Sequence, residues 1–180
     1  MLIRIIWCKE REENINKIID EIWCKVEVIW DKEKNVIETL CRALDTDKDV
    51  IILEDDVELC NNFLEKAKAE IKKHKGCFIM FYNANAAEII EYDDENYIWS
   101  RVWTQAYYIP KWVAKGMAEY VKNDTEYSPL GRYSNPMYQY LEKCWIKMHL
   151  VKPSLVQHLW FWSLIPWHEH CNHYSRKFKK

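Results

Sequence analysis

The first 82 residues alternate short runs of apolar, often β-branched residues with stretches in which apolar residues recur at helical spacing. This pattern predicts four strands, at 2–7, 26–30, 50–53 and 77–82. It also predicts three helices, at 12–22, 34–44 and 59–74. Such alternation is typical of an α/β domain with a mainly parallel sheet sandwiched by helices, and ligands of such sheets bind beyond the carboxyl ends of the strands.

The second half of the chain begins with an acid-rich polar stretch at 83–100, which we expect to be a solvated loop. Further elements are expected at 105–109 (strand), 112–121 (helix after Pro110), 135–146 (helix after an Asn135-Pro136 cap) and 149–151 (strand). No Ser/Gly-rich linker and no internal repeat divides the sequence. We therefore expect one domain over 1–175, made of halves 1–82 and 83–175, followed by a basic tail at 176–180.

Composition and charge narrow the possible classes of protein. A chain of 180 residues with 49% hydrophobic content can bury a sizeable core, and its net charge is −2. Four positive charges fall in the last five residues, so the body is acidic and gives little support for broad nucleic-acid binding. No apolar run reaches the roughly 20 residues of a membrane helix, and the first residues lack the pattern of a secretory signal. We expect a soluble, cytoplasmic protein.

Cysteine, glycine and tryptophan usage adds three expectations. The seven cysteines are scattered singly without any CxxC, and we interpret them as reduced core thiols. Ten tryptophans accompany only three glycines, so neither GxGxxG nor GxxxxGK[ST] occurs. A glycine-rich phosphate loop is excluded, and any nucleotide must be held in another way.

Three consecutive carboxylates, Glu54-Asp55-Asp56, follow the apolar run Val50–Leu53. They are predicted to lie at the carboxyl end of a strand, where ligands of a parallel sheet bind. Adjacent anions repel, and a divalent cation or strong hydrogen-bond donors would neutralise them. The alternative is a helix N-terminus, where acidic residues interact favourably with the helix dipole.

A strand followed by EDD and a helix, in a β/α half at the N-terminus, resembles the DxD-type motif of GT-A nucleotide-sugar glycosyltransferases. The later segment 153–158, PSLVQH, resembles the ending of small glycosyltransferases of bacterial and phage origin. The two motifs occur in the family's order, and the resemblance covers roughly residues 2–163. It implies a single GT-A-like domain that is similar to Rossmann folds, with a nucleotide-sugar-binding half and an acceptor and metal-closing half.

The resemblance also implies a metal site. Asp56 would bind the Mn²⁺ or Mg²⁺ that bridges the donor diphosphate, and His158 would complete this site. Glu54 would face the ribose or the sugar, with Asp55 in support. Hard carboxylate oxygens suit these cations, and a cation across a diphosphate stabilises the departing charge. The alternative for His158 is a packed histidine beside Trp160.

The loop after the first strand would hold the nucleotide according to the same resemblance, which makes Cys8 and Arg11 donor-binding candidates. Asp31, at the end of the second strand, would bond the base or the ribose. Each has a simpler alternative: Arg11 as the exposed first turn of a helix, and Asp31 as an N-cap.

The catalytic base and the acceptor side are less well marked. Inverting members of the family use an acid before the last helix to take the acceptor proton, and here Asp124 and Glu126 are the candidates in that region. The alternative is that both are solvated loop acids. Trp103 and Gln105 fall where the family lines the acceptor cleft. Their chemistry suits that role, since an indole can stack on a sugar ring and an amide can bond hydroxyls. Core packing is the alternative for Trp103.

The segment 168–173, HEHCNH, places three histidines, one cysteine and one glutamate, all potential metal ligands, within six residues. Structural zinc sites usually take pairs of ligands from two elements, so a polar loop that closes over the donor is the other interpretation.

The sequence thus predicts a metal-dependent glycosyltransferase that moves a sugar from a nucleotide-diphosphate sugar, foremost a UDP-sugar, to an acceptor hydroxyl. The acceptor would be a glycan, a protein or modified phage DNA, in the cytoplasm of a bacterium or of a phage-infected cell. The alternative is a non-catalytic GT-A-like protein that binds carbohydrate or nucleotide.

Overall fold

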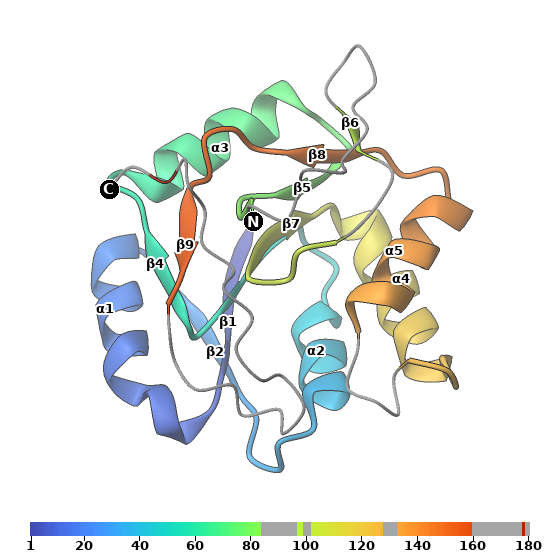
Figure 1. The fold of residues 1–180 in the computed structure, drawn as a ribbon, viewed down its shortest axis with the longest axis horizontal. Helices are drawn as coiled ribbons and strands as arrows, with labels where there is room; N and C mark the ends of the chain where they lie inside the picture. Colours follow the sequence, from blue (N-terminus) through green and yellow to red (C-terminus); the bar gives the residue numbers. More distant parts are fainter. Residues whose placement is uncertain (84–96, 99–101, 128–132, 160–177, 179–180) are drawn as a thin grey trace.

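A seven-stranded sheet forms the centre of the protein in the computed structural model, which describes residues 1–83, 97–98, 102–127, 133–159 and 178 (Figure 1). The strands are β1 Leu2–Trp7, β2 Glu27–Trp30, β3 Val50–Glu54, β4 Val57–Leu59, β5 Phe78–Met80, β6 Tyr97–Ile98, β7 Ala106–Ile109, β8 Met148–Leu150 and β9 Val156–His158. The order in the sheet is β2-β1-β3-β7-β5-β8-β6, and β4 pairs separately with β9.

The sheet is mainly parallel, as predicted. Its strands β2, β1, β3, β5 and β8 run in one direction, and β7 and β6 run against them. The inner strand β3 pairs in parallel with β1 and antiparallel with β7. Its four residues Val50–Leu53 are fully buried, as expected for an apolar run covered on both faces.

Helices cover both faces of the sheet (Figure 1). The helices are η1 Lys9–Arg11, a short 3-10 helix, and α1 Glu12–Ile22, α2 Val36–Leu44, α3 Phe63–Lys73, α4 Lys111–Asn123 and α5 Ser134–Lys143. On one face α2 packs against α4, and α4 packs against α5. On the other face lie α1 and α3, and α3 reaches the sheet through the edge-to-face contact of Phe63 with Phe81. No helix within the described ranges is long and apolar enough to cross a membrane.

The order of the strands was not predicted, and it places β7 antiparallel between β3 and β5. Two details of the predicted layout are wrong. The predicted helix at 59–74 begins only at Phe63, since β4 occupies Val57–Leu59. The Asn135-Pro136 pair is not a cap, because α5 already begins at Ser134.

The cysteines also differ in part from the expectation of core thiols. Cys8, Cys60 and Cys77 are buried and reduced, and Cys41 is half-buried. Cys24 and Cys144 are exposed, because they lie beyond the ends of α1 and α5, where the chain turns at the surface. Cys171 lies outside the described residues.

Candidate functional site

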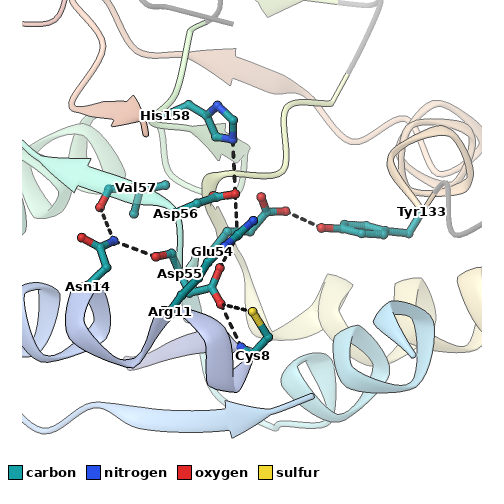
Figure 2. A network of polar contacts seen from close by, with 9 residues as sticks. All are labelled: Cys8, Arg11, Asn14, Glu54, Asp55, Asp56, Val57, Tyr133 and His158. Atoms are coloured by element: carbon teal, nitrogen blue, oxygen red, sulfur yellow. Dashed lines mark hydrogen bonds and ion pairs between the residues drawn. The ribbon is translucent and has the colours of Figure 1, made fainter. Parts of the chain in front are cut away.

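The three carboxylates of the acidic run lie at the carboxyl end of β3, as predicted, and they point in different directions (Figure 2). Glu54, the last residue of β3, turns toward the start of α5, and Asp55, in the turn that follows β3, turns toward the start of α1. Asp56 lies between them and faces His158. The run is thus the meeting point of three parts of the fold.

Asp55 is fixed by the loop after β1. Its Oδ2 accepts hydrogen bonds from the Cys8 backbone N–H (2.8 Å) and thiol (3.1 Å), and its Oδ1 lies 2.6 Å from the Arg11 guanidinium. The Asn14 amide, from α1, donates to the Asp55 carbonyl (2.6 Å) and to the Val57 carbonyl (3.2 Å). Because both carboxylate oxygens have protein partners, Asp55 serves to hold this loop against the end of β3.

Asp56 has a different environment. Its Oδ2 lies 2.7 Å from Arg11 and 3.3 Å from Nε2 of His158. Its Oδ1 is buried and has no hydrogen-bond partner among the described residues. An unpartnered buried carboxylate oxygen is costly, and a bound cation would satisfy it. Arg11 therefore bridges two acids, and Asp56 keeps one oxygen available for a ligand.

His158 reaches the acidic run through the pairing of β4 with β9. The register sets Val57 opposite His158, which places the histidine beside the preceding Asp56. The Leu159 N–H donates to the Asp56 carbonyl at 2.7 Å. Upstream, the buried Ser154 hydroxyl donates to the Val156 carbonyl (2.6 Å) and accepts from the Asn83 N–H (3.2 Å). The PSLVQH segment thus carries the histidine and also holds β9 in place.

Glu54 lies on the opposite side of the cluster. The Tyr133 hydroxyl, at the start of α5, donates to its Oε1, and the Glu54 N–H donates to the Gln105 carbonyl at 2.9 Å. Oε1 of Gln105 is buried and has no partner in the described parts of the chain. Gln105, predicted on the acceptor side, is therefore a direct neighbour of the acidic run.

Burial and mutual charge shift the pKa values of the cluster. Burial, together with the charge of Asp56, raises the pKa of Glu54 to about 7. Burial alone would raise the pKa of Asp56 as well, but its contacts with His158 and Arg11 outweigh this effect and lower it. Burial would lower the pKa of His158, yet Asp56 raises it above its ordinary value. The contact between Asp56 and His158 therefore favours the charged form of both side chains.

Aromatic rings extend the site beyond His158. The Tyr82 ring lies 6.2 Å from the His158 ring and makes an edge-to-face contact with Trp103 at 6.1 Å, centroid to centroid. Burial and the nearby Asp56 and Glu54 raise the pKa of Tyr82, so its hydroxyl stays neutral. Trp103 is itself largely buried, which leaves little of its indole accessible to a ligand.

Three predicted site residues make their contacts elsewhere. Asp31 follows β2 at the same edge of the sheet, but its carboxylate accepts the Asn35 N–H at 2.8 Å, and the N-cap of α2 is Asn35. Asp124 ends α4 and accepts the Tyr127 N–H at 2.6 Å. It lines a surface hollow of about 540 Å³ between α4 and α5 that includes no residue of the acidic cluster. Glu126 is exposed in the same loop.

Sequence reasoning missed Asn14 and Tyr133. Asn14 is buried and lies one and two helical turns before Ile18 and Ile22 on the inner side of α1. A polar residue on an apolar helix face needs hydrogen-bond partners, and this signal points to Asn14. Tyr133 precedes α5 in a polar loop, and no local pattern identifies it.

The basic tail, apart from Phe178, and the HEHCNH segment at 168–173 lie outside the described residues, as does Trp160. Phe178 packs against the core.

The ligand types at the acidic run suit a divalent cation, although the described residues bring three ligand atoms within 4.8 Å of one another only at Glu70, His74 and His149. Asp56 and Glu54 offer carboxylate oxygens, and His158 offers an imidazole nitrogen once it loses its proton, a combination that suits Mn²⁺ better than a site of oxygens alone. When Glu54 is ionised, three carboxylates face Arg11 and His158, so the cluster keeps an excess of negative charge. A cation at Asp56 would neutralise it.

No family model matches the sequence, and no curated protein matches it. Solved structures match the fold. A Bacillus anthracis protein named as a glucose-1-phosphate thymidylyltransferase, in complex with a sucrose, is 12% identical with a TM-score of 0.52, over 86% of this chain and 69% of its own. The CTP:phosphocholine cytidylyltransferase of Streptococcus pneumoniae is 9% identical with a TM-score of 0.51, over 88% of this chain and 72% of its own.

A third match is a glycosyltransferase involved in the glycosylation of the major capsid of PBCV-1, which is 11% identical with a TM-score of 0.50. The match covers 90% of this chain and 96% of that chain. At such identities a structural match establishes the fold and leaves the chemistry to the site. The chain thus has the Rossmann-like α/β fold of these nucleotidyl- and glycosyltransferases, as the sequence predicted.

Proposed function

We propose that the protein is a metal-dependent glycosyltransferase that uses a nucleotide-diphosphate sugar as donor. The observation that carries the proposal is the meeting of Asp56 and His158 at the carboxyl end of β3, with one oxygen of Asp56 unpartnered. Ligands of open α/β sheets bind at this edge. The matched structures support the proposal in that all three are named as transferases.

The side chains have distinct roles in this proposal. Asp56 and His158 would hold Mn²⁺ or Mg²⁺, and the cation would neutralise the charge that develops on the departing diphosphate. Glu54 faces the ribose or the sugar. Arg11 stays paired with Asp55 and Asp56 and adds positive charge beside the diphosphate. Cys8 and Asp55 act mainly by fixing the loop that carries Arg11.

The acceptor side is assigned to Gln105, and the largely buried Trp103 stays a predicted acceptor contact through the small part of its indole that is exposed. Gln105 has a buried amide oxygen with no described partner, and it adjoins Glu54 through the backbone. Asp124 and Glu126 remain the predicted candidates for the base that takes the acceptor proton, and Asp31 remains a predicted donor contact. The acceptor is a hydroxyl of a glycan, a protein or modified DNA, and we place the reaction in the cytoplasm.

Glycosyl transfer is favoured over nucleotidyl transfer by two observations. The chain has its first glycine at Gly76, so no glycine-rich loop follows β1 to hold a triphosphate with backbone amides. The glycosyltransferase match covers 96% of that structure, whereas the two nucleotidyltransferase matches cover 69% and 72% of theirs.

Incubation with a panel of UDP-, GDP- and dTDP-sugars and Mn²⁺ tests the proposal, with the released product identified. We expect release of a nucleoside diphosphate by the wild type and a loss of at least about 100-fold in Asp56→Asn, because metal stabilisation of the leaving group is worth several kcal/mol. Asp20→Asn is the matched control, since Asp20 is exposed on α1. Metal-dependent binding without turnover would favour the non-catalytic alternative, and release of pyrophosphate from a nucleoside triphosphate would favour nucleotidyl transfer.

A further inference from the structure

A second group of potential metal ligands lies between α3 and β8. Glu70 lies in the last turn of α3, and His74 is the residue that caps this helix, with its N–H donating to the Glu70 carbonyl at 2.9 Å. His149 is the middle residue of β8 and points to the same place. One ligand atom from each residue lies within 4.8 Å of the others. The group shares no residue with the acidic run.

The distances within this group suit direct coordination of a small cation. Nε2 of His149 lies 3.3 Å from Oε2 of Glu70, and Nε2 of His74 lies 3.7 Å from the same oxygen. In a tetrahedral zinc site with bonds of about 2.0–2.1 Å, neighbouring ligand atoms are separated by roughly 3.3–3.5 Å. The three ligand atoms are therefore close enough to share one ion once the side chains are oriented toward it.

The site is enclosed but accessible. The side chains of His74 and His149 are 10% and 8% exposed, and Glu70 is 27% exposed. A metal ion would be shielded by the two rings, and solvent would reach it past Glu70. Burial also lowers the pKa of both histidines, which favours the neutral ring that metal ligation requires.

We propose that Glu70, His74 and His149 form a second metal site that takes a zinc-class divalent ion, with solvent in the fourth position. Two imidazoles and one carboxylate are a ligand set that zinc uses with an open coordination position. Imidazole nitrogens favour zinc over Mg²⁺, which prefers oxygen ligands. The site would link α3 to β8 and stabilise the native state in proportion to metal occupancy.

Coordination requires one rearrangement. The two imidazole rings are stacked, with centroids 3.5 Å apart and planes tilted by 16°. Metal ligands bind in the plane of an imidazole ring, so the two rings must turn apart when the ion enters. The stacked pair with its carboxylate is the metal-free arrangement.

Titration of the purified chain with Co²⁺ and Zn²⁺ tests the site. The visible absorption of Co²⁺ reports tetrahedral coordination, and competition with Zn²⁺ gives the zinc affinity. We expect Glu70→Gln and His149→Ala to weaken zinc binding by at least about 100-fold, because loss of an outer-shell partner of a ligand already costs 10–100-fold. Mg²⁺ in excess should not compete. Zinc should raise the Tm of the wild type and leave that of Glu70→Gln unchanged.

Two control variants separate this site from the others. Asp56→Asn disables the proposed catalytic cation site, and a triple change of His168, His170 and His173 to Ala disables the HEHCNH segment; both should bind zinc like the wild type. A thiolate-to-cobalt charge-transfer band would show that a cysteine binds the metal and would contradict the assigned ligands. If His149→Ala fails to fold, the partly exposed Glu70→Gln still decides the question. The inference is overturned if the wild type binds no zinc, if Glu70→Gln binds it normally, or if binding is lost in either control.

Discussion

Nε2 of His158 lies 3.3 Å from Oδ2 of Asp56, although the two residues are 102 positions apart in the chain. The pairing of β4 with β9 creates this contact, because it sets the residue after Asp56 opposite His158. Each partner stabilises the charged form of the other: Asp56 raises the pKa of His158, and His158 helps to lower that of Asp56. The two motifs that resemble glycosyltransferases thus meet at one point of the fold.

Replacement of Arg11 by Met should destabilise the protein strongly. The guanidinium contacts Asp55 at 2.6 Å and Asp56 at 2.7 Å, and all three side chains are nearly buried. Removal of one partner leaves buried charge uncompensated, which typically costs about 3–5 kcal/mol. Urea unfolding of Arg11→Met at pH 7 measures this loss of free energy of unfolding.

Lys17→Met is the matched control for Arg11, because Lys17 is 66% exposed in its ion pair with Glu13. Its effect should stay within about 0.5 kcal/mol. The double variant Arg11→Met with Asp55→Asn should lose less stability than the sum of its single changes, since neutral Asn no longer needs a counter-charge. Strict additivity would contradict the role assigned to Arg11.

Asn14→Ala should cost about 1–3 kcal/mol, because it leaves the carbonyl groups of Asp55 and Val57 without the donor that they share. Asn16→Ala is the matched control, on the same helix but exposed, and its better helix propensity should make it neutral or slightly stabilising. Parallel urea titrations compare the two. Equal stabilities of the two variants would show that Asn14 does not hold the turn after β3.

The pKa of Glu54 predicts a pH-dependent difference between the wild type and Glu54→Gln. Its folded pKa, about 7, lies above the ordinary value of 4.5, so the folded state binds the proton more tightly than the unfolded state does. The contribution of Glu54 to stability is therefore full below about pH 4.5 and is lost as the pH rises through about 7. Glu54→Gln removes this loss.

The free energy of unfolding of Glu54→Gln, relative to the wild type, should therefore rise between pH 5 and pH 8 by about 1 kcal/mol or more. Urea unfolding of both proteins at the two pH values measures this difference. Glu119→Gln, a change at an exposed position of α4, should show no such trend. A relative stability of Glu54→Gln that does not change with pH would mean that Glu54 titrates normally.

Local patterns were sufficient to predict the strands β1, β2 and β3 and the place of the acidic run. A fully buried parallel strand is a continuous apolar run, and Val50–Leu53 shows this signal directly. The position of β7 is set by long-range pairing with Val50–Leu53 and with β5, and no local pattern records it. The three-residue strand β4 was missed for the same reason, because its partner β9 lies about a hundred residues later.

The site residues also divide into those that the sequence predicts and those that only long-range packing brings to the site. Cys8, Arg11 and the three acids come from neighbouring strand ends, where the topology of a parallel sheet brings residues together. Tyr133 reaches Glu54 only through the placement of α5, so the sequence alone could not predict it. Asp124 and Glu126 are predicted as candidate bases only from their place in the chain. The structure sets Asp124 in a hollow between α4 and α5.

Binding of Mn²⁺ in the presence of UDP, followed by the electron paramagnetic resonance signal of free Mn²⁺, tests the central claim most directly. The account predicts that wild-type protein with UDP lowers the free Mn²⁺ signal beyond UDP alone, that Asp20→Asn behaves identically, and that Asp56→Asn and His158→Ala bind at least about 10-fold more weakly. If the wild type does not bind Mn²⁺, or if Asp56→Asn binds it as tightly as the wild type does, the assignment of Asp56 and His158 as the cation site is contradicted.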